Sequence, residues 1–253
     1  MKSLVRWGVT LGLVGSTFLG VFLPNLPVLA LPEKQVKDKL DSVPVYLITN
    51  SKGLPLSRVL PDGQKGSVTG VYMSREEAQA FIRALQNAQS KDPKLEETVK
   101  GLQVTAIPLG SIYQQLQETK NKPDRLSFAF KPVDQEVQGA LELLRQSGQK
   151  IDKFESVPVF AVRFAPGKGY VSIQVPNDKE QLIPLFLSKQ DAQGLLAQVK
   201  PKYPTADIQV IDVDGVIKTF QDKNDGWLNQ VVLIPSPESR EYIKTLPASK
   251  APK

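Results

Sequence analysis

The order of hydrophobic and polar positions repeats along the chain. The segment Val-Pro-Val-Tyr at residues 43–46 returns as Val-Pro-Val-Phe at residues 157–160, and residues 71–79 return as residues 185–193. Position 157 lies 114 residues after position 43, and position 185 lies 114 residues after position 71. Two ordered matches at one offset indicate an internal repeat.

A third, weaker match extends the repeat. Residues 102–104 align with residues 208–210 at an offset of 106, which implies a shorter connection in the second copy. The Lys- and Glu-rich residues 90–100 are then the additional segment of the first copy.

Each copy predicts a strand, a turn-rich hairpin region, a strand, a helix, a strand and a helix. Ser74 and Ser188 fit helix N-caps, with Glu77 and Asp191 three residues later as in a capping box. Hydrophobic residues then fall on one helical face in both copies. They are Ala78, Phe81, Ile82 and Leu85 in the first copy and Ala192, Leu195, Leu196 and Val199 in the second.

The later part of each copy also corresponds. A strand at residues 126–130 precedes a helix at about residues 133–147, and a strand at residues 228–234 precedes a helix at about residues 237–246. We therefore predict an α/β (α+β) protein of two pseudosymmetric repeats of about 100 residues, each with mixed strands and amphipathic helices. The repeats occupy residues 31–148 and 149–247, followed by a disordered tail at 248–253. Whether the strands form one sheet or two stays open.

Residues 1–30 have the three parts of a secretory signal peptide. Lys2 and Arg6 precede an apolar run at residues 7–22, and Val-Leu-Ala ending at Ala30 forms a cleavage site. The alternative is that the segment is retained as a membrane anchor. The chain contains no Cys, which excludes lipoprotein anchoring.

The composition of the chain excludes several kinds of active site. The mature chain would carry 30 basic and 26 acidic side chains, because the 32 basic residues include Lys2 and Arg6. This mild basic excess is below that of a nucleic-acid-binding face. The chain has no His and no Cys, so a Ser-His-Asp triad, thiol catalysis and Cys metal sites are impossible. We expect no enzyme activity, no catalytic residues, no cofactor and no metal, although a Ser-Lys dyad without a supporting motif stays open.

Two acidic segments resemble calcium loops weakly. Residues 212–215 (Asp-Val-Asp-Gly) lack the further oxygen ligands and the terminal Glu of such a loop, so we interpret them as a turn. Residues 222–226 predict a polar loop.

Apolar surface is the remaining candidate site. The equivalent helices place Phe81 and Leu85 in one copy, and Leu195 and Val199 in the other, where they would line related hydrophobic grooves. The alternative is that all four side chains pack onto the sheet.

The repeated segments also resemble a known family. The Val-Pro-Val-Phe strand at residues 157–160 and the Leu-Phe-Leu-Ser-Lys-Gln-Asp-Ala segment at residues 185–192 are similar to the Tic twenty-two family, over roughly residues 38–247. Its members are soluble proteins of the chloroplast intermembrane space and the cyanobacterial periplasm. The bacterial signal favours the cyanobacterial branch. The resemblance implies a pseudosymmetric α/β fold without catalytic residues.

The resemblance also implies a function. We expect a periplasmic, chaperone-like protein that binds unfolded or translocating polypeptides in envelope protein transport and outer-membrane biogenesis. Its partners would be outer-membrane precursors and the barrel assembly machinery with its POTRA domains, with no nucleic acid and no membrane segment after signal cleavage. Additional residence in the thylakoid lumen stays open. The alternative is an adaptor that docks onto a membrane translocation or assembly machine without holdase activity, and a third hypothesis is an undetected hydrolase.

Overall fold

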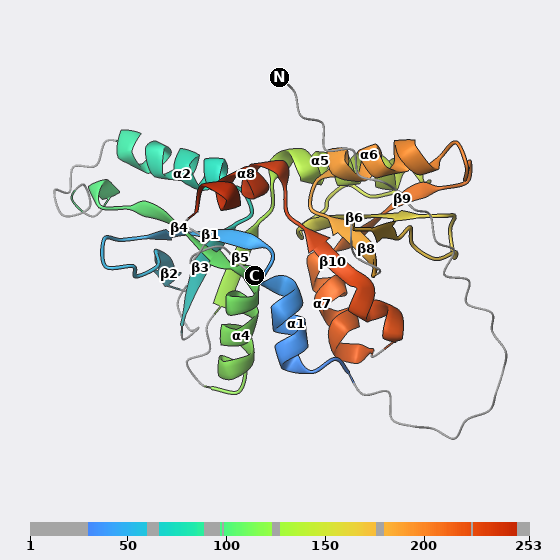
Figure 1. The fold of residues 1–253 in the computed structure, drawn as a ribbon. Helices are drawn as coiled ribbons and strands as arrows, with labels where there is room; N and C mark the ends of the chain where they lie inside the picture. Colours follow the sequence, from blue (N-terminus) through green and yellow to red (C-terminus); the bar gives the residue numbers. More distant parts are fainter. Residues whose placement is uncertain are drawn as a thin grey trace.

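The computed structural model describes residues 30–59, 66–88, 97, 99–122, 127–175, 180–223 and 225–246. The predicted signal segment up to residue 29 and the predicted tail lie outside these residues. Figure 1 shows three layers, with helices above two neighbouring sheets and further helices below them. No helix in the described ranges combines the length and apolar character needed to cross a bilayer.

Apart from α1 in the first half and a 3₁₀ turn in the second, the described parts of the two halves form matching sets of elements. The first half contains α1 (Glu33–Leu40), β1 (Pro44–Thr49), β2 (Ser57–Val59), β3 (Ser67–Tyr72), α2 (Arg75–Asn87), β4 (Gln103–Pro108), α4 (Leu109–Thr119), β5 (Ser127–Lys131) and α5 (Asp134–Gln146). The second contains β6 (Pro158–Arg163), β7 (Ile173–Gln174), β8 (Gln181–Phe186), α6 (Lys189–Val199), β9 (Asp207–Asp212), α7 (Val213–Asp222), a 3₁₀ turn at Gly226–Gln230, β10 (Val231–Ile234) and α8 (Pro237–Thr245).

Each half builds its own sheet with the same topology. In the first sheet β1 pairs antiparallel with β3 and β4, β2 pairs antiparallel with β3, and β5 pairs parallel with β3. In the second sheet β6, β8, β9, β7 and β10 repeat these pairings in the corresponding places. The structure therefore confirms the mixed α/β fold with two pseudosymmetric repeats.

The strand register corrects one sequence alignment. Pro44 of β1 lies opposite Pro108 of β4, and the equivalent Pro158 of β6 lies opposite Asp212 of β9. Positions 108 and 212 differ by 104, so the predicted offset of 106 is wrong. A slip of two residues keeps every side chain on the same face of a strand, so the hydrophobic pattern matched in both alignments.

The interpretation of residues 212–215 as a turn is also wrong. Asp212 is the N-cap of α7, and its side chain accepts a hydrogen bond from the Gly215 N–H at 2.5 Å. Asp is a preferred N-cap residue because its carboxylate satisfies a free first-turn N–H. The pattern that resembled a cation loop is a helix start.

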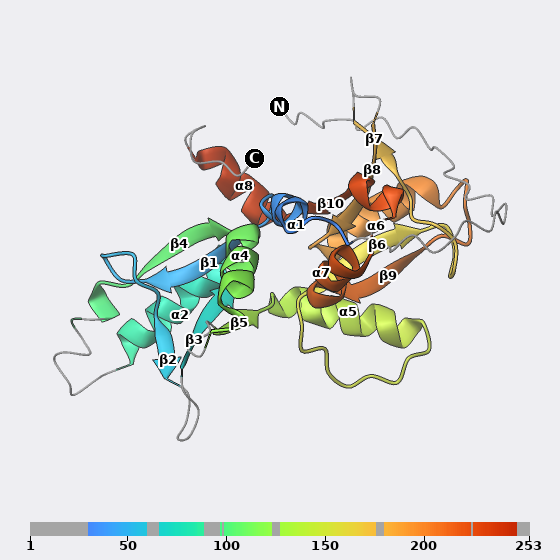
Figure 2. The ribbon, with the colours of Figure 1, turned by 90° about the horizontal axis from the view of Figure 1, so that it is seen from below.

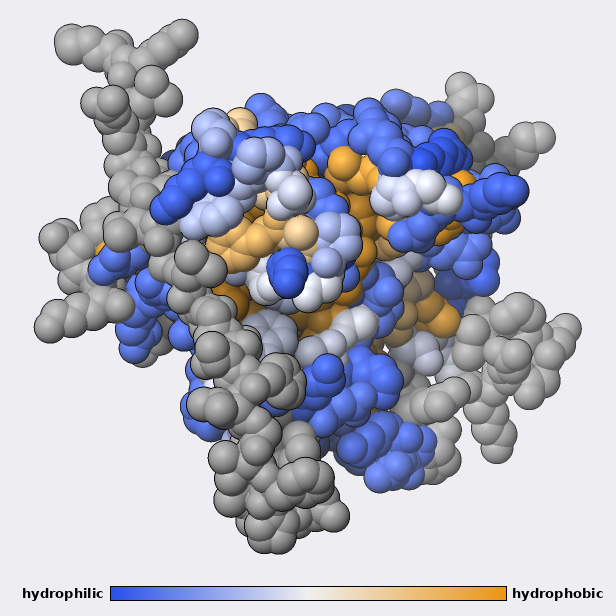
Figure 3. All heavy atoms as spheres, turned by 90° about the vertical axis from the view of Figure 1, so that its right-hand side faces the viewer, coloured by the Kyte–Doolittle hydropathy of each residue, from blue (hydrophilic) through white to orange (hydrophobic). Residues whose placement is uncertain are grey.

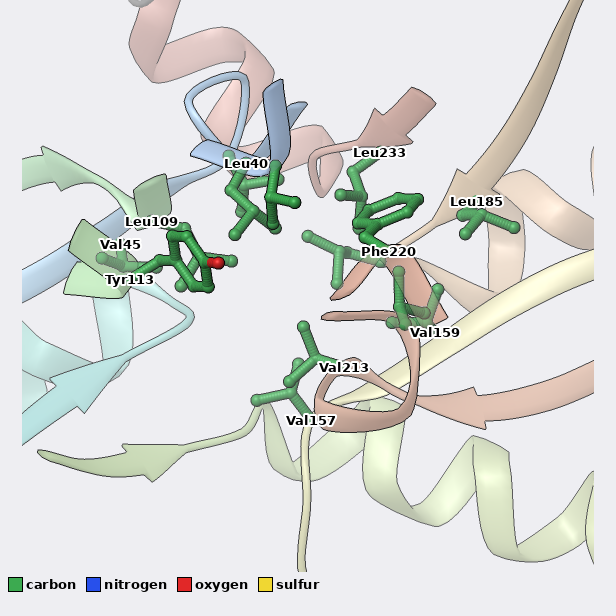
Figure 4. Packing of buried hydrophobic residues seen from close by; sticks show 14 of the residues in the cluster. Leu40, Val45, Leu109, Tyr113, Val157, Val159, Leu185, Val213, Phe220 and Leu233 are labelled. Carbon is green, nitrogen blue, oxygen red and sulfur yellow. The ribbon is translucent and has the colours of Figure 1, made fainter. Parts of the chain in front are cut away.

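The inner faces of both sheets share one hydrophobic core. Figure 2 shows α1 between α4 and α7, and Figure 4 shows Leu40 of α1 between the side chains of the two halves. The helices α1 and α4 are so close that a Cβ at Gly110 would lie 2.5 Å from the Lys37 carbonyl oxygen. The core residues come from both repeats, including Val45, Leu47, Leu109, Tyr113, Val159, Leu185, Val213, Phe220 and Leu233.

The outer faces are covered by an exchange of helices. The helix α5 follows the first sheet in sequence, but its Ala140 packs with Phe160 and Val162 of the second sheet. The helix α8 follows the second sheet, but its Tyr242 packs on Tyr46 of the first, with ring centroids 5.8 Å apart. Each repeat therefore contributes its last helix to the other repeat, and the outer helices α2, α8, α5 and α6 form one layer above the sheets (Figure 1).

Candidate functional site

The N-termini of the outer helices α2, α5, α6 and α8 lie close together. We call this place the crossing, because α5 and α8 pass here from their own repeat to the other. Ser74, Ser188 and Ser236 are the N-caps of α2, α6 and α8. Each hydroxyl oxygen accepts a hydrogen bond from the N–H three residues later, at 3.1, 3.4 and 3.2 Å. The predicted caps at Ser74 and Ser188 are confirmed.

At this crossing, carboxylates of one helix accept hydrogen bonds from first-turn N–H groups of a neighbouring helix. Glu238 of α8 accepts from the Glu76 N–H of α2 at 2.8 Å, and Glu77 of α2 accepts from the Asp134 N–H of α5 at 3.1 Å. Glu136 of α5 accepts from the Lys189 N–H of α6 at 2.7 Å. Free N–H groups and the helix dipole both favour negative charge at a helix start. These acids therefore stabilise the packing of the exchanged helices against their neighbours.

Ion pairs add to the connection. Arg240 of α8 donates two hydrogen bonds to the Asp191 carboxylate of α6, at 2.6 and 3.2 Å. Lys189 of α6 pairs with Glu142 of α5, and this contact holds the pKa of Glu142 below its ordinary value. Burial raises the pKa of Glu136, against the smaller opposing effect of the hydrogen bond from the Lys189 backbone.

A polar surface cleft of about 670 Å³ lies over this crossing. It gathers serine hydroxyls, Lys189 and several glutamates, which are the groups that a hydrolase would require. The same serine oxygens serve as helix caps, and the carboxylates of Glu77, Glu136 and Glu238 accept from backbone N–H groups. Within the described part of the chain, no group of three or more acidic side chains is placed to hold a metal ion.

A second, more hydrophobic hollow lies beside α6. We call it the α6 groove, a space of about 720 Å³ between α6, the end of β10 and strands β7 and β8. Its apolar lining comes from Ile173, Phe186, Leu195, Ile234, Pro235 and Pro237. Polar groups around it come from Gln174, Gln190, Asp191, Gln198 and Arg240. Gly194 of α6 also lines the groove. An apolar hollow with a few polar groups is the usual form of a binding site.

Figure 3, which looks onto the second repeat, shows hydrophobic side chains open at the surface within polar surroundings. The corresponding position of the first repeat carries aromatic surface. Tyr72 and Phe81 there are the equivalents of Phe186 and Leu195, and their ring centroids lie 5.9 Å apart. Phe81 is 41% exposed, among the most exposed large hydrophobic side chains of the described residues. Both repeats therefore present apolar surface at equivalent corners.

The four predicted groove residues separate into two groups. Phe81 is exposed and Leu85 is half-buried, on the outer side of α2. Leu195 is 6% exposed and Val199 is fully buried, because both pack on the second sheet. Leu195 also lines the α6 groove, whereas Val199 is a core residue of the second repeat and is not among the residues that line this groove. Among the described residues, α2 therefore keeps Phe81 at the surface, whereas α6 packs Leu195 and Val199 against its sheet.

Sequence reasoning missed most of the α6 groove. Ile173, Phe186 and Ile234 come from three strands, of which β10 is far from β7 and β8 in sequence, and they meet because β10 and β7 flank β8. Gly194 was a usable signal, because a glycine inside an amphipathic helix lowers helix stability and often marks an open or close-packed position. A Cβ at Gly194 would meet no atom within 4 Å.

Comparison with known proteins agrees with this fold. Residues 16–245 match the Tic22-like family. A solved structure of Anabaena Tic22, described as a protein of protein transport, shares 71% identity with a TM-score of 0.83, covering 86% of this chain and 98% of that chain. A solved Tic22 from Plasmodium falciparum shares 18% identity with a TM-score of 0.59, covering 83% and 96%, and shows the same fold. No curated protein matches the chain.

Proposed function

Because the chain belongs to the Tic22-like family, we propose that it acts as a periplasmic, chaperone-like protein that binds unfolded or translocating polypeptides. The Anabaena relative is described as a protein of protein transport, which agrees with a role in polypeptide traffic. We place this role in envelope protein transport and outer-membrane biogenesis. Binding, rather than catalysis, is the activity that we propose.

The α6 groove is the observation that carries the proposal. Its volume of about 720 Å³ and its mainly apolar lining suit apolar side chains of an extended client. Each Å² of apolar surface removed from water contributes roughly 25 cal/mol before the costs of association. Several side chains in the groove would therefore support weak, reversible binding, as a holdase requires.

Gly194 allows the groove to be blocked without removing any packing. It lies in α6, lines the groove and has open space at its Cβ position. Gly194→Arg would place a long, charged side chain into the groove, whereas Gly194→Ala is the matched control. Both changes should favour the helix, because glycine in a helix costs about 0.5–1 kcal/mol relative to alanine.

The test is suppression of aggregation of a urea-denatured outer-membrane barrel protein by residues 31–253. We expect suppression by the wild type and by Gly194→Ala, and a loss of several-fold for Gly194→Arg with unchanged thermal unfolding. If the wild type fails to suppress aggregation at several-fold molar excess, the holdase proposal is wrong. The adaptor hypothesis then stands, and pull-down of purified POTRA domains would test it.

A further inference from the structure

The two sheets end in equivalent edge strands that are protected differently. In the second sheet the Ile234 carbonyl accepts from the Leu187 N–H, on the side of β8. Backbone groups alternate in direction along a strand, so those of Val231 and Leu233 face the outer edge. There the Lys39 Nζ donates to the Val231 carbonyl at 3.0 Å, and the Ser42 Oγ donates to the Leu233 carbonyl at 3.3 Å.

This protection comes from the start of the first repeat. Lys39 lies in α1 and Ser42 follows it, so the helix lies along the edge of β10. Val231 and Leu233, whose side chains belong to the shared core, are 1% and 2% exposed. Natural sheets commonly cover or block their edges in this way, because free edge groups pair with other chains.

The edge of β5 has no such cover among the described residues. The Met73 N–H donates to the Lys131 carbonyl on the β3 side, so the backbone groups of Phe128 and Phe130 face outward. Within the described ranges, no strand pairs with this edge and no side chain donates to these two carbonyls. Both phenylalanines are partly exposed, unlike their equivalents on β10.

The reason is a difference between the segments that precede the repeats. No helix forms at residues 147–157, in the place corresponding to α1. Ser156 is the equivalent of Ser42, but its hydroxyl donates to Asp214 at 3.2 Å instead of to the strand edge. The cover of β10 therefore has no counterpart on β5.

The open edge specifies the chemistry of its occupant. It offers alternating N–H and C=O groups, which one extended main chain satisfies together. Phe128 and Phe130 lie on the core side, whereas Ser127 and Ala129 lie on the other face. An added strand would therefore match best with apolar residues on one face and small or polar residues on the other.

The outer edges of β4 and β9 are less suited to pairing. The strand β4 ends at Pro108, which has no N–H, and β9 carries Asp207 and Asp212 at its two ends. Proline and charge both disfavour strand addition at an edge.

We propose that the edge of β5 binds client polypeptide by strand addition, taking extended segments in which apolar and polar residues alternate. Strands of transmembrane β-barrels have this alternation. The proposal rests on the proposed function, since it assigns a second binding element and a substrate class to the same activity. It also extends that function, because main-chain pairing recognises the pattern of a segment and not one sequence.

The probe is a short synthetic peptide in which valine and phenylalanine alternate with threonine and serine. Its control twin carries N-methyl groups on all central amides, so neither of its edges can pair. We expect the twin to bind residues 31–253 at least about tenfold more weakly in fluorescence titrations. Amide hydrogen exchange at Phe128 and Phe130 should slow with the first peptide and not with the twin.

Variants test the same edge from the protein side. Phe128→Pro removes an outward N–H that the pairing with β3 does not use, and Phe128→Val keeps it. We expect the proline variant to lose peptide binding and the valine variant to keep it, with both folded by circular dichroism.

Equal binding of both peptides, or unchanged exchange at Phe128 and Phe130, would overturn the proposal. Suppression of client aggregation by the wild type under those conditions would leave the groove-based function intact. Absence of suppression with protected Phe128 and Phe130 amides would reject the holdase and retain the strand-addition site.

Discussion

Single residues at the helix crossing explain why a cluster of serines and acids need not be a reactive site. Ser74, Ser188 and Ser236 each accept from a backbone N–H, and Glu136 does so across two helices. Sequence alone predicted the first two caps, because a serine directly before an amphipathic helix is a local pattern. It did not predict the interhelical bond of Glu136, because that contact depends on where the exchanged helices lie.

The pH dependence of stability tests the burial of Glu136. Burial, with the nearby Asp191 carboxylate acting in the same direction, raises the pKa of Glu136 above its ordinary value of 4.5, although the Lys189 contacts oppose this. A raised folded-state pKa stabilises the fold fully below the unfolded pKa, and this contribution is lost as the pH rises through the folded value.

Glu136→Gln removes this titration and retains an oxygen that accepts from the Lys189 N–H. We therefore expect urea unfolding between about pH 4 and about pH 7 to show the variant gaining stability relative to the wild type as the pH rises. Parallel profiles for the two proteins would contradict a raised pKa.

The helix faces give a second test at the residue scale. Leu195→Asp would bury a charge in the core of the second repeat, and we expect a loss of about 3 kcal/mol or more. Phe81→Asp lies at an exposed position and should cost about 1 kcal/mol or less. Chemical denaturation of both variants measures the difference, and similar losses would show that the two equivalent helices are equally buried.

Elements differ in how well local patterns specify them. The strands at residues 44–49 and 158–163 follow from β-branched residues, and the helices after Ser74 and Ser188 follow from N-capping and hydrophobic periodicity. The helix α1 was missed, because Pro32 at its N-cap gives no side-chain hydrogen bond. The usable signal was the spacing of Val36 and Leu40, which are both fully buried on one face.

The position of α8 yields a prediction at the scale of elements. Tyr242 stacks edge-on against Tyr46, and the Arg75 guanidinium lies 5.0 Å from the centre of the Tyr242 ring. Tyr242→Ala should therefore speed amide exchange in β1 of the first sheet and leave β6 of the second sheet unaffected. Exchange that increases mainly in β6 would show that α8 supports its own repeat.

The whole molecule is held together by the exchange of α5 and α8 and by α1 in the shared core. The sequence repeat predicted two similar halves, but it carried no information on which sheet each last helix covers. Either choice leaves the same hydrophobic face buried, so periodicity is identical in both. The two exchanged helices begin directly after Val133 and Ser236, which are their N-caps.

Fragments test this organisation. Residues 31–148 and 149–247, made separately, would each lack the helix that covers their sheet. We expect each fragment alone to show no cooperative thermal unfolding, and an equimolar mixture to recover it in circular dichroism. Two fragments that each unfold cooperatively on their own would contradict the interdependence of the halves.

The helix exchange also determines when folding can finish. A chain that emerges with its N-terminus first presents β1 early, but the partner of Tyr46 is within the last residues that the structure describes. The Tyr46 hydroxyl and the Ser239 hydroxyl lie 3.0 Å apart only once nearly two hundred intervening residues have followed, since the pair is separated by 193 positions. The first half therefore stays incomplete until the end of the chain has been made. A product truncated before α8 would leave the outer face of the first sheet uncovered around Tyr46.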